Sequence, residues 1–363
     1  MSAPRLEIDL DKIQHNACTL VERLASRGIA VTGVTKAFLG NPDIVHALLR
    51  AGVRSLGDSR IENIDSMRRA NIEAPLALIR SPMLSQAEQV VALADVSFNT
   101  ELEVIRKLSS VAQRAKRIHK IILMVELGDL REGIMPVDLE HTVGETLALP
   151  NIQLQGIGTN LACRCGVSPD ADNMAELSSL ADAIEARFKI QLSIVSGGNS
   201  GNLQWALSGA DTGRINDLRL GESILLGCET LQRQTIDGLY TDAISLVAEV
   251  IESKDKPAQP WGEIAQNAFG EHTVIRKQGT IAQAILAIGR QDIDPDGLEA
   301  PDGIEILGAS SDHLILDTGA SYLPVGSELR FQLNYSALTR AMSSPFVTQH
   351  IMGGNTELVS NYF

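Results

Sequence analysis

Cysteine is scarce in this chain, with only 4 residues among 363. Cys18 and Cys228 stand alone, and Cys163 and Cys165 form a C-R-C pair that no histidine follows at zinc-finger spacing. The sequence therefore predicts neither a disulfide framework nor a metal site, and it indicates free thiols in a reducing cytoplasm.

Long apolar runs and positive charge are also in short supply. Stretches such as Ile121–Val125 are far too short to cross a membrane, and residues 1–11 lack the apolar core of a signal peptide. Lys and Arg number 31 against 45 Asp and Glu, which gives a net charge of −14. Nucleic acids and anionic membranes would be repelled, so we expect neither as a partner.

The composition is otherwise that of an ordinary globular protein. Aromatic residues make up 4 % and hydrophobic residues 44 % of the chain, and the mean hydropathy is +0.04. A chain of 363 residues is long enough for one large domain and a smaller one.

Apolar, β-branched runs alternate with amphipathic helical patterns through the first two thirds of the chain. Such alternation predicts a parallel sheet, and eight β-then-α units favour a closed (β/α)8 barrel of the TIM type over an open doubly wound sheet. The predicted strands are 29–35, 53–57, 76–80, 95–98, 121–126, 152–158, 192–196 and 215–220. The predicted helices are 41–51, 59–70, 85–93, 100–117, 137–147 and 170–187.

The pattern changes near residue 236, where short strands separated by Gly, Pro and Asp turns begin. These strands are predicted at 246–253, 279–287, 303–307, 314–317 and 328–333. We therefore expect an α/β chain with a (β/α)8 barrel over residues 1–235 and a smaller β-rich C-terminal domain over residues 236–363.

One lysine stands at a position with chemical meaning. The run from Ile29 to Thr35 ends in Lys36, and the turn Ala37–Gly40 follows, so Lys36 is expected at the carboxyl end of a buried strand. A poorly hydrated amine there is a nucleophile that forms Schiff bases with aldehydes such as pyridoxal 5'-phosphate (PLP). The alternative is a lysine that extends from the strand end into solvent.

Two later loops have the composition of a phosphate site. Ser196–Gly201 and Arg219–Glu222 follow the last two predicted barrel strands, where TIM barrels often bind phosphate. Arg219 also suits contact with the pyridine nitrogen of PLP, because a guanidinium keeps that nitrogen unprotonated and favours simple proton transfer at Cα. A turn and a salt bridge at the barrel rim are the alternatives.

Together these motifs resemble the fold-type III PLP enzymes, the alanine racemase superfamily, and most of all its ornithine racemase-like branch. The resemblance runs almost end to end, and the order and spacing of the motifs make it specific. The matching pieces are Leu6–Leu10 with Asn16, Val34–Ala37, Gly57–Arg60, Glu126–Gly133, Gly156–Asn160, Gly198–Ser200, Leu218–Glu222, Ala287–Asp292 and Gly308–Asp317.

The resemblance assigns a role to each matching residue. It implies that Lys36 binds PLP covalently and serves as one of two proton-transfer bases, with Arg219 facing the ring nitrogen and Arg131 near the phenolic oxygen. Asn160 falls where alanine racemases carry a histidine against the ring face, which is a departure from the family pattern. The residues implied to cradle the phosphate are Asn199, Ser200, Gly221 and Glu222, the last two through their backbone N–H groups.

A second departure concerns the other base. Alanine racemases use a tyrosine of the partner subunit within a Gly-Tyr-x-Asp-Gly motif, and this chain has Gly289–Ile293, G-R-Q-D-I, instead. Arginine is a poor general base because its pKa is above about 12. Histidine titrates near neutral pH, so His313 and its neighbour Asp312 are the candidates, followed by Tyr322 and Tyr335.

Substrate binding is predicted from the same motifs. Asp292, Asp312 and Glu222 offer carboxylates to a distal ammonium group, and Arg290 offers a bidentate partner to the substrate carboxylate. The resemblance therefore implies a PLP-dependent racemase of a free amino acid, ornithine or another basic one, that acts as a homodimer. The alternatives are a PLP homeostasis protein and a PLP lyase of the D-threonine aldolase or D-serine dehydratase kind, for which Asp312–His313 is a partial metal signature.

Overall fold

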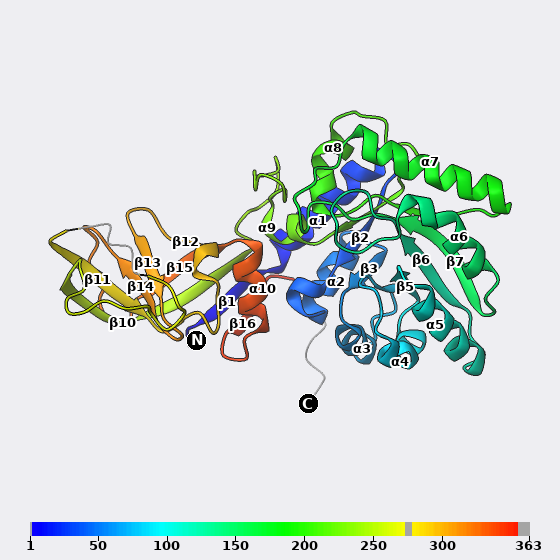
Figure 1. The fold of residues 1–363 in the computed structure, drawn as a ribbon. Helices are drawn as coiled ribbons and strands as arrows, with labels where there is room; N and C mark the ends of the chain where they lie inside the picture. The colour runs from blue at the N-terminus through cyan, green and yellow to red at the C-terminus, as the bar shows by residue number, and fades with distance from the viewer. Residues whose placement is uncertain (1, 273–277, 355–363) are drawn as a thin grey trace. The chain divides into compact units, whose positions relative to one another are not determined.

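The computed structural model describes residues 2–272 and 278–354, which form two compact units (Figure 1). Residues 10–241 make up one unit. The residues before position 10 and those after position 241 make up the other.

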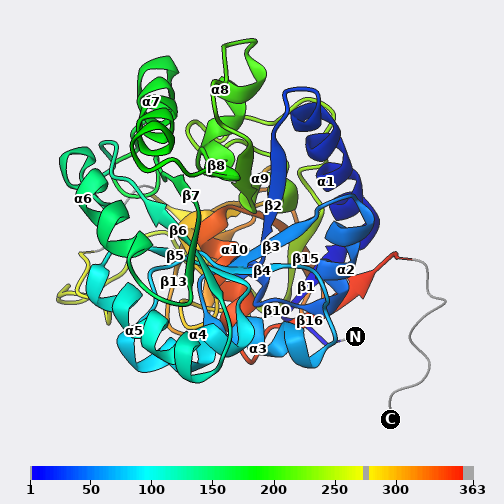
Figure 2. The same cartoon turned by 90° about the vertical axis from the view of Figure 1, so that its right-hand side faces the viewer.

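The first unit is a closed barrel of eight parallel strands in the order β2-β3-β4-β5-β6-β7-β8-β9. Figure 2 shows helices α3 to α7 arranged around the outside of these strands. The predicted barrel is confirmed and the open sheet is excluded. The strands are β2 Ala30–Val34, β3 Ser55–Asp58, β4 Leu76–Leu78, β5 Val96–Asn99, β6 His119–Met124, β7 Ile152–Gly158, β8 Ile194–Ser196 and β9 Asp217–Leu220.

The six predicted helices are all present, and α1 precedes them without having been predicted. In the parts of the chain that the structure describes, no helix is long and apolar enough to cross a membrane. The helices are α1 Leu10–Ala25, α2 Pro42–Arg50, α3 Ile61–Arg69, α4 Ala87–Leu93, α5 Leu102–Arg114, α6 Pro136–Leu147, α7 Ala171–Phe188, α8 Leu203–Leu207 and α9 Glu222–Leu226.

The barrel interior is polar on one side and apolar on the other. Inward side chains of β4 to β6 form a buried apolar cluster of Ala77, Phe98, Ile122 and Met124. Polar side chains of β2, β3, β8 and β9 are joined by hydrogen bonds instead. Arg219 of β9 lies 5.2 Å from the Phe98 ring of β5, and this contact crosses the interior because the two strands are not neighbours.

The second unit is built on an eight-stranded, mostly antiparallel sheet, with helix α10 (Tyr335–Ser343) beside it. The predicted β-rich domain is therefore confirmed. Its strands are β1 Arg5–Asp9, β10 Ile244–Pro257, β11 Thr280–Leu286, β12 Leu298–Glu299, β13 Glu305–Ala309, β14 Leu314–Asp317, β15 Glu328–Leu333 and β16 Thr348–Met352.

The predicted division into 1–235 and 236–363 is wrong at both ends of the barrel. β1 pairs with β10 in antiparallel and with β16 in parallel orientation, so the N-terminal strand belongs to the second unit. The barrel unit continues to Thr241, because Asn16 of α1 holds the backbone of Tyr240 with two hydrogen bonds of 2.8 Å.

Replacing Leu6 with alanine tests this placement of β1. Leu6 is fully buried between β10 and β16, so its loss is expected to lower the free energy of unfolding by about 2–4 kcal/mol. Urea unfolding of the variant measures the change. Glu328→Gln is the control, because its ion pair with Arg5 is partly exposed and worth about 1 kcal/mol or less. Equal effects of the two changes would contradict a core role for β1.

A buried histidine on the barrel wall makes stability depend on pH. Burial lowers the pKa of His119 from 6.5 to about 4, and its Nε2 lies 2.8 Å from Ser97 Oγ. The unfolded chain binds a proton at this site below pH 6.5 and the folded chain does so only near pH 4, so stability falls as pH drops through this window. The expected loss is about 3 kcal/mol. Urea unfolding from pH 7 to 4 measures it, and a His119→Gln variant with the same pH slope would contradict it.

Candidate active site

Lys36 lies two residues after the end of β2, directly after Thr35, and begins the 3-10 turn Lys36–Phe38 at the carboxyl end of the barrel. Its side chain is half-buried, and within the described residues its amine makes no hydrogen bond or ion pair. The residue lies where the sequence predicted it. An unpaired amine at a barrel mouth is free to bond an aldehyde, which is the chemistry that PLP requires.

Asp58, at the end of β3, is fully buried beside this turn. Its Oδ2 accepts a hydrogen bond of 2.6 Å from Thr35 Oγ1, and its Oδ1 accepts bonds from the Arg60 N–H at 2.8 Å and Asn63 Nδ2 at 3.1 Å. Burial raises the pKa of Asp58, and these three hydrogen bonds, together with the positive charge of Lys36, oppose that rise. The sequence supplied the motif Gly57–Arg60 but no role for this carboxylate.

The two predicted phosphate-type loops lie side by side, after β8 and β9. Ser200 Oγ is 3.0 Å from Ser223 Oγ and accepts a hydrogen bond of 3.2 Å from the Ser223 N–H. Gly198 has φ +144°, and a Cβ there would lie 2.1 Å from Asn202 Oδ1, so the first loop requires glycine. The buried hydroxyls of Ser200 and Ser223, together with the N–H groups of Gly221 and Glu222 at the start of α9, make a donor set that fits a phosphate.

Arg219 is buried within the barrel, and burial lowers its pKa. Its Nη1 donates to Ser196 Oγ at 2.5 Å, and its Nη2 donates to Thr159 O at 2.7 Å and Asn160 Oδ1 at 3.1 Å. Three of its five N–H bonds are thus committed, which leaves the Nε–H and one Nη1–H as donors. The alternative of a salt bridge at the barrel rim is excluded, because Arg219 is buried and no carboxylate forms an ion pair with it among the described residues.

Asp217 supplies a negative charge two residues before Arg219, on the same face of β9. Its carboxylate accepts hydrogen bonds from Ser196 Oγ and, at 2.6 Å, from Thr32 Oγ1. Since Ser196 also accepts from Arg219, a hydroxyl links the buried cation to the buried anion. Sequence reasoning missed Asp217, although its spacing of two from Arg219 on a predicted strand places both side chains on one face.

Asn160 connects the Arg219 site to the first phosphate-type loop. Its Oδ1 accepts hydrogen bonds from Arg219 Nη2 and, at 3.0 Å, from Asn199 Nδ2. Its Nδ2 donates to the sulfur of Cys163 at 3.0 Å. The amide thus positions neighbouring side chains through hydrogen bonds, where the family pattern has an aromatic ring.

Arg131 lies on the loop after β6, where two carboxylates shape the backbone. Glu126 accepts hydrogen bonds from the N–H groups of Gly128, Leu130 and Arg131 at 2.6–3.2 Å. The buried Asp129 holds the neighbouring loop through the N–H groups of residues 163, 164 and 165. The Arg131 guanidinium itself pairs with Glu132.

Glu222 contributes a side chain as well as a backbone N–H. Burial raises the pKa of its carboxyl group, and Arg233 Nη1, 3.3 Å from Oε1, opposes that rise together with the charge of Lys36. The side chain therefore has a cationic partner in this unit already. Its predicted contact with a substrate ammonium has no direct support from this geometry.

The remaining predicted residues belong to the second unit. Two adjoining loops carry Arg290, Asp292, Asp312 and His313, whereas Tyr335 begins α10. A Cβ on Gly289 would lie 2.3 Å from the Asp312 N–H nitrogen, so the loop at Arg290 packs directly on the loop of Asp312 and His313. Asp312 Oδ1 is 2.9 Å from His313 Nδ1, and a hydrogen bond from Ser311 lowers the pKa of Asp312. Asp292 accepts a hydrogen bond of 2.6 Å from Ser344 Oγ.

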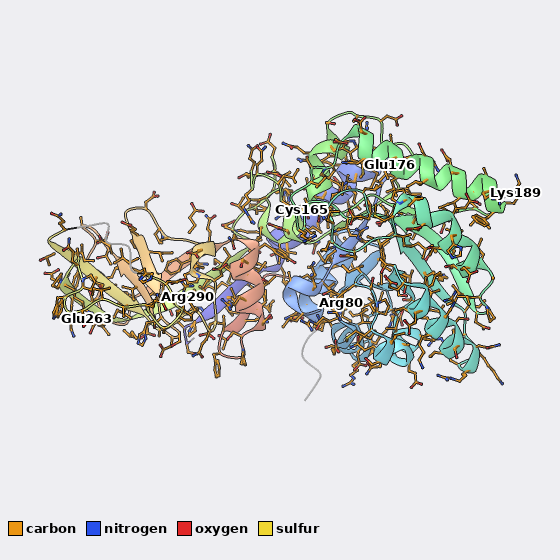
Figure 3. All side chains as sticks on the ribbon, in the orientation of Figure 1. Arg80, Cys165, Glu176, Lys189, Glu263 and Arg290 are labelled. Atoms are coloured by element: carbon orange, nitrogen blue, oxygen red, sulfur yellow. The ribbon has the colours of Figure 1, made fainter. Side chains whose placement is uncertain are left out.

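Arg290, labelled in Figure 3, is held on two sides. Its guanidinium lies 5.0 Å from the Phe269 ring, and its Nη2 lies 3.3 Å from Glu271 Oε2. Its Nε is buried without a partner in the described residues. Tyr322 is highly exposed. Over residues 2–272 and 278–354, no group of three His, Cys, Asp or Glu side chains lies close enough to hold a metal ion.

Comparison with known proteins agrees with this fold. The alanine racemase N-terminal domain family matches residues 8–227. The ornithine racemase of Acetoanaerobium sticklandii is 39% identical over 354 residues, which cover 96% of this chain and 99% of that protein. The lysine racemase of Thermotoga maritima is 39% identical over 349 residues, with coverage of 96% and 98%.

Solved structures share the fold at lower sequence identity. The alanine racemase from a D-cycloserine-producing Streptomyces lavendulae superposes with a TM-score of 0.77 at 18% identity, and covers 98% of each chain. A D-threonine aldolase from Filomicrobium marinum superposes with a TM-score of 0.73 at 16% identity, over 94% of this chain and 89% of that one.

The chain therefore belongs to the alanine racemase family, whose members are amino-acid racemases dependent on PLP. The barrel residues fit that cofactor: an unpaired lysine amine, a buried arginine with spare donors, and two loops of hydroxyl and N–H donors lie at the carboxyl ends of the strands.

Proposed function

We propose that this protein is a PLP-dependent racemase that inverts Cα of a free basic amino acid, ornithine or lysine. The observation that carries the proposal is the match to an ornithine racemase and a lysine racemase, which extends over both units rather than over the barrel alone. The unpaired Lys36 amine at the barrel mouth supports it independently.

The barrel residues have separate roles in binding the cofactor and in proton transfer. Bound PLP supplies the electron withdrawal that acidifies Cα–H. Lys36 removes or returns the proton on one face of Cα. Arg219 donates a hydrogen bond to the ring nitrogen and keeps it unprotonated, since a guanidinium does not give up its proton. Gly221, Glu222, Asn199 and Ser200 bind the phosphate, while Arg131 and Asn160 orient the ring.

Inversion of Cα also needs a second base and groups that bind the substrate. His313, hydrogen-bonded to Asp312, serves as the second base because histidine takes and gives protons near neutral pH. Arg290 binds the substrate carboxylate in place of Glu271, and Asp292 and Asp312 attract the distal ammonium. These assignments rest on the sequence match and on the packing of the two loops.

We also propose a homodimer located in the cytoplasm. Six large apolar side chains of the barrel unit are exposed on segments that follow β2, β4 and β6, which is typical of a protein interface: Leu39, Met83, Leu84, Leu130, Met135 and Val137. The four unpaired cysteines are consistent with a reducing compartment. Sedimentation of the purified protein tests the dimer.

Exchange of Cα–H in D2O, followed by NMR, tests the activity. The PLP-loaded protein is offered both enantiomers of alanine, serine, arginine, lysine and ornithine. Exchange together with inversion of the basic amino acids alone is the expected result. Exchange without inversion, or cleavage of a β-hydroxy amino acid, would indicate a lyase, and no exchange despite lysine-bound PLP would indicate a carrier of the cofactor.

A further inference from the structure

Asp58 is a buried carboxylate that has no role in the proposed reaction. It ends β3, is fully buried, and accepts three hydrogen bonds from Thr35 Oγ1, the Arg60 N–H and Asn63 Nδ2. Among the residues that the structure describes, no basic side chain forms an ion pair with it. Burial of a carboxylate destabilises the folded state, so we expect Asp58 to have a role other than stability.

The Asp58 contact falls on the residue directly before Lys36. Thr35 is fully buried, and its N–H donates to Gly57 O at 2.9 Å while its hydroxyl donates to Asp58. Its carbonyl accepts from the N–H groups of Phe38 at 3.1 Å and Gly40 at 3.2 Å. Thr35 is therefore fixed at its amide, its side chain and its carbonyl, and the end of β3 supplies two of these three contacts.

These contacts of Thr35 fix the position of the Lys36 backbone. Thr35 is the N-cap of the turn Lys36–Phe38, and Leu39 closes that turn with φ 55°. The flexible side chain of Lys36 extends from this fixed backbone, so the position of Cα limits the positions that the amine can reach. The positive charge of Lys36 also stabilises the ionised Asp58 carboxylate across this contact.

We propose that Asp58 is a positioning residue, which acts through the Thr35 hydroxyl to hold the Lys36 turn so that the amine reaches both the cofactor aldehyde and the substrate Cα. The part that concerns Cα rests on the proposed racemase function. The part that concerns the aldehyde needs only that Lys36 binds PLP.

Covalent capture of PLP on Lys36 by borohydride, quantified by mass spectrometry per PLP bound, tests the proposal. Asp58→Asn keeps the size of the side chain but removes its charge and one acceptor oxygen. We expect the captured fraction per bound PLP to fall and kcat to drop about tenfold or more, with KM little changed. Thr35→Val removes the linking hydroxyl at nearly constant volume and is expected to reproduce both effects.

Asp65→Asn is the matched control, because Asp65 lies on the adjacent helix α3 in an exposed pair with Arg69. It should leave capture and kcat unchanged. An Asp58→Asn enzyme that melts at a lower temperature but captures PLP like the wild type would overturn the proposal, and so would an inert Thr35→Val. If the wild type inverts no amino acid, the racemase function fails, whereas a loss of capture in both variants still supports the positioning role.

Discussion

Replacing Lys36 with alanine is expected to abolish covalent attachment of PLP and to lower kcat for inversion by at least about a thousandfold. Two roles disappear together, since the same amine is proposed to hold the cofactor and to move the proton. The structure supports such a large effect because, among the described residues, no second lysine forms a hydrogen bond with this turn. Visible absorbance of bound PLP and chiral chromatography of ornithine measure the two losses.

One further variant separates the chemistry of the amine from its charge, and a second variant is the control. Lys36→Arg keeps a cation at the turn but cannot bond an aldehyde, so it should be as inactive as the alanine variant. Lys189→Ala removes an exposed lysine at the C-cap of α7 and should retain full activity. Turnover close to wild type in either Lys36 variant would refute the assignment.

Replacing Asp217 with asparagine is expected to lower the free energy of unfolding by about 3 kcal/mol. The change leaves the buried Arg219 guanidinium without the negative charge that reaches it through Ser196. Burial already lowers the pKa of Arg219, so the loss of this anion adds to an existing cost. Urea unfolding of the protein without PLP measures the effect and separates it from any loss of cofactor binding.

Asp182→Asn is the comparison for this experiment. Asp182 pairs with Arg214 on the protein surface, and such pairs contribute about 1 kcal/mol or less. The PLP affinity of the Asp217 variant should also fall, because Ser196 then loses the anion that orients its hydroxyl toward Arg219. A variant with wild-type stability and affinity would show that the hydroxyl link carries no charge compensation.

Local sequence patterns were sufficient to predict the barrel. Its eight strands lie in short apolar runs, and six of its helices carry amphipathic patterns, so these elements can be recognised from about a dozen residues each. β1 was missed because its partners lie about 240 and 340 positions away along the chain. No local pattern reports such a pairing, and residues 6–10 were recognised only as a resemblance.

The site was predicted in part for a similar reason. Lys36, Ser200 and Gly221 follow strands, where the barrel rule directs attention. Asp58 and Cys163 were missed, because their contacts depend on how separate loops fold against each other. The Asp129 carboxylate fixes the loop of Cys163, because it accepts hydrogen bonds from three N–H groups more than 30 residues later in the chain.

The pairing of β1 with β16 also sets an order of events during synthesis. The barrel, residues 10–241, has all its strands once the ribosome has passed position 241. The sheet of the other unit then still lacks β16, which is made more than 100 residues later and lies directly against the first strand. The N-terminal strand can therefore pair with β10 soon after the barrel is made, but its other edge has no partner until the end of the chain is synthesised. For this reason, a fragment that stops at the barrel would carry an unpaired, aggregation-prone strand at its N-terminus.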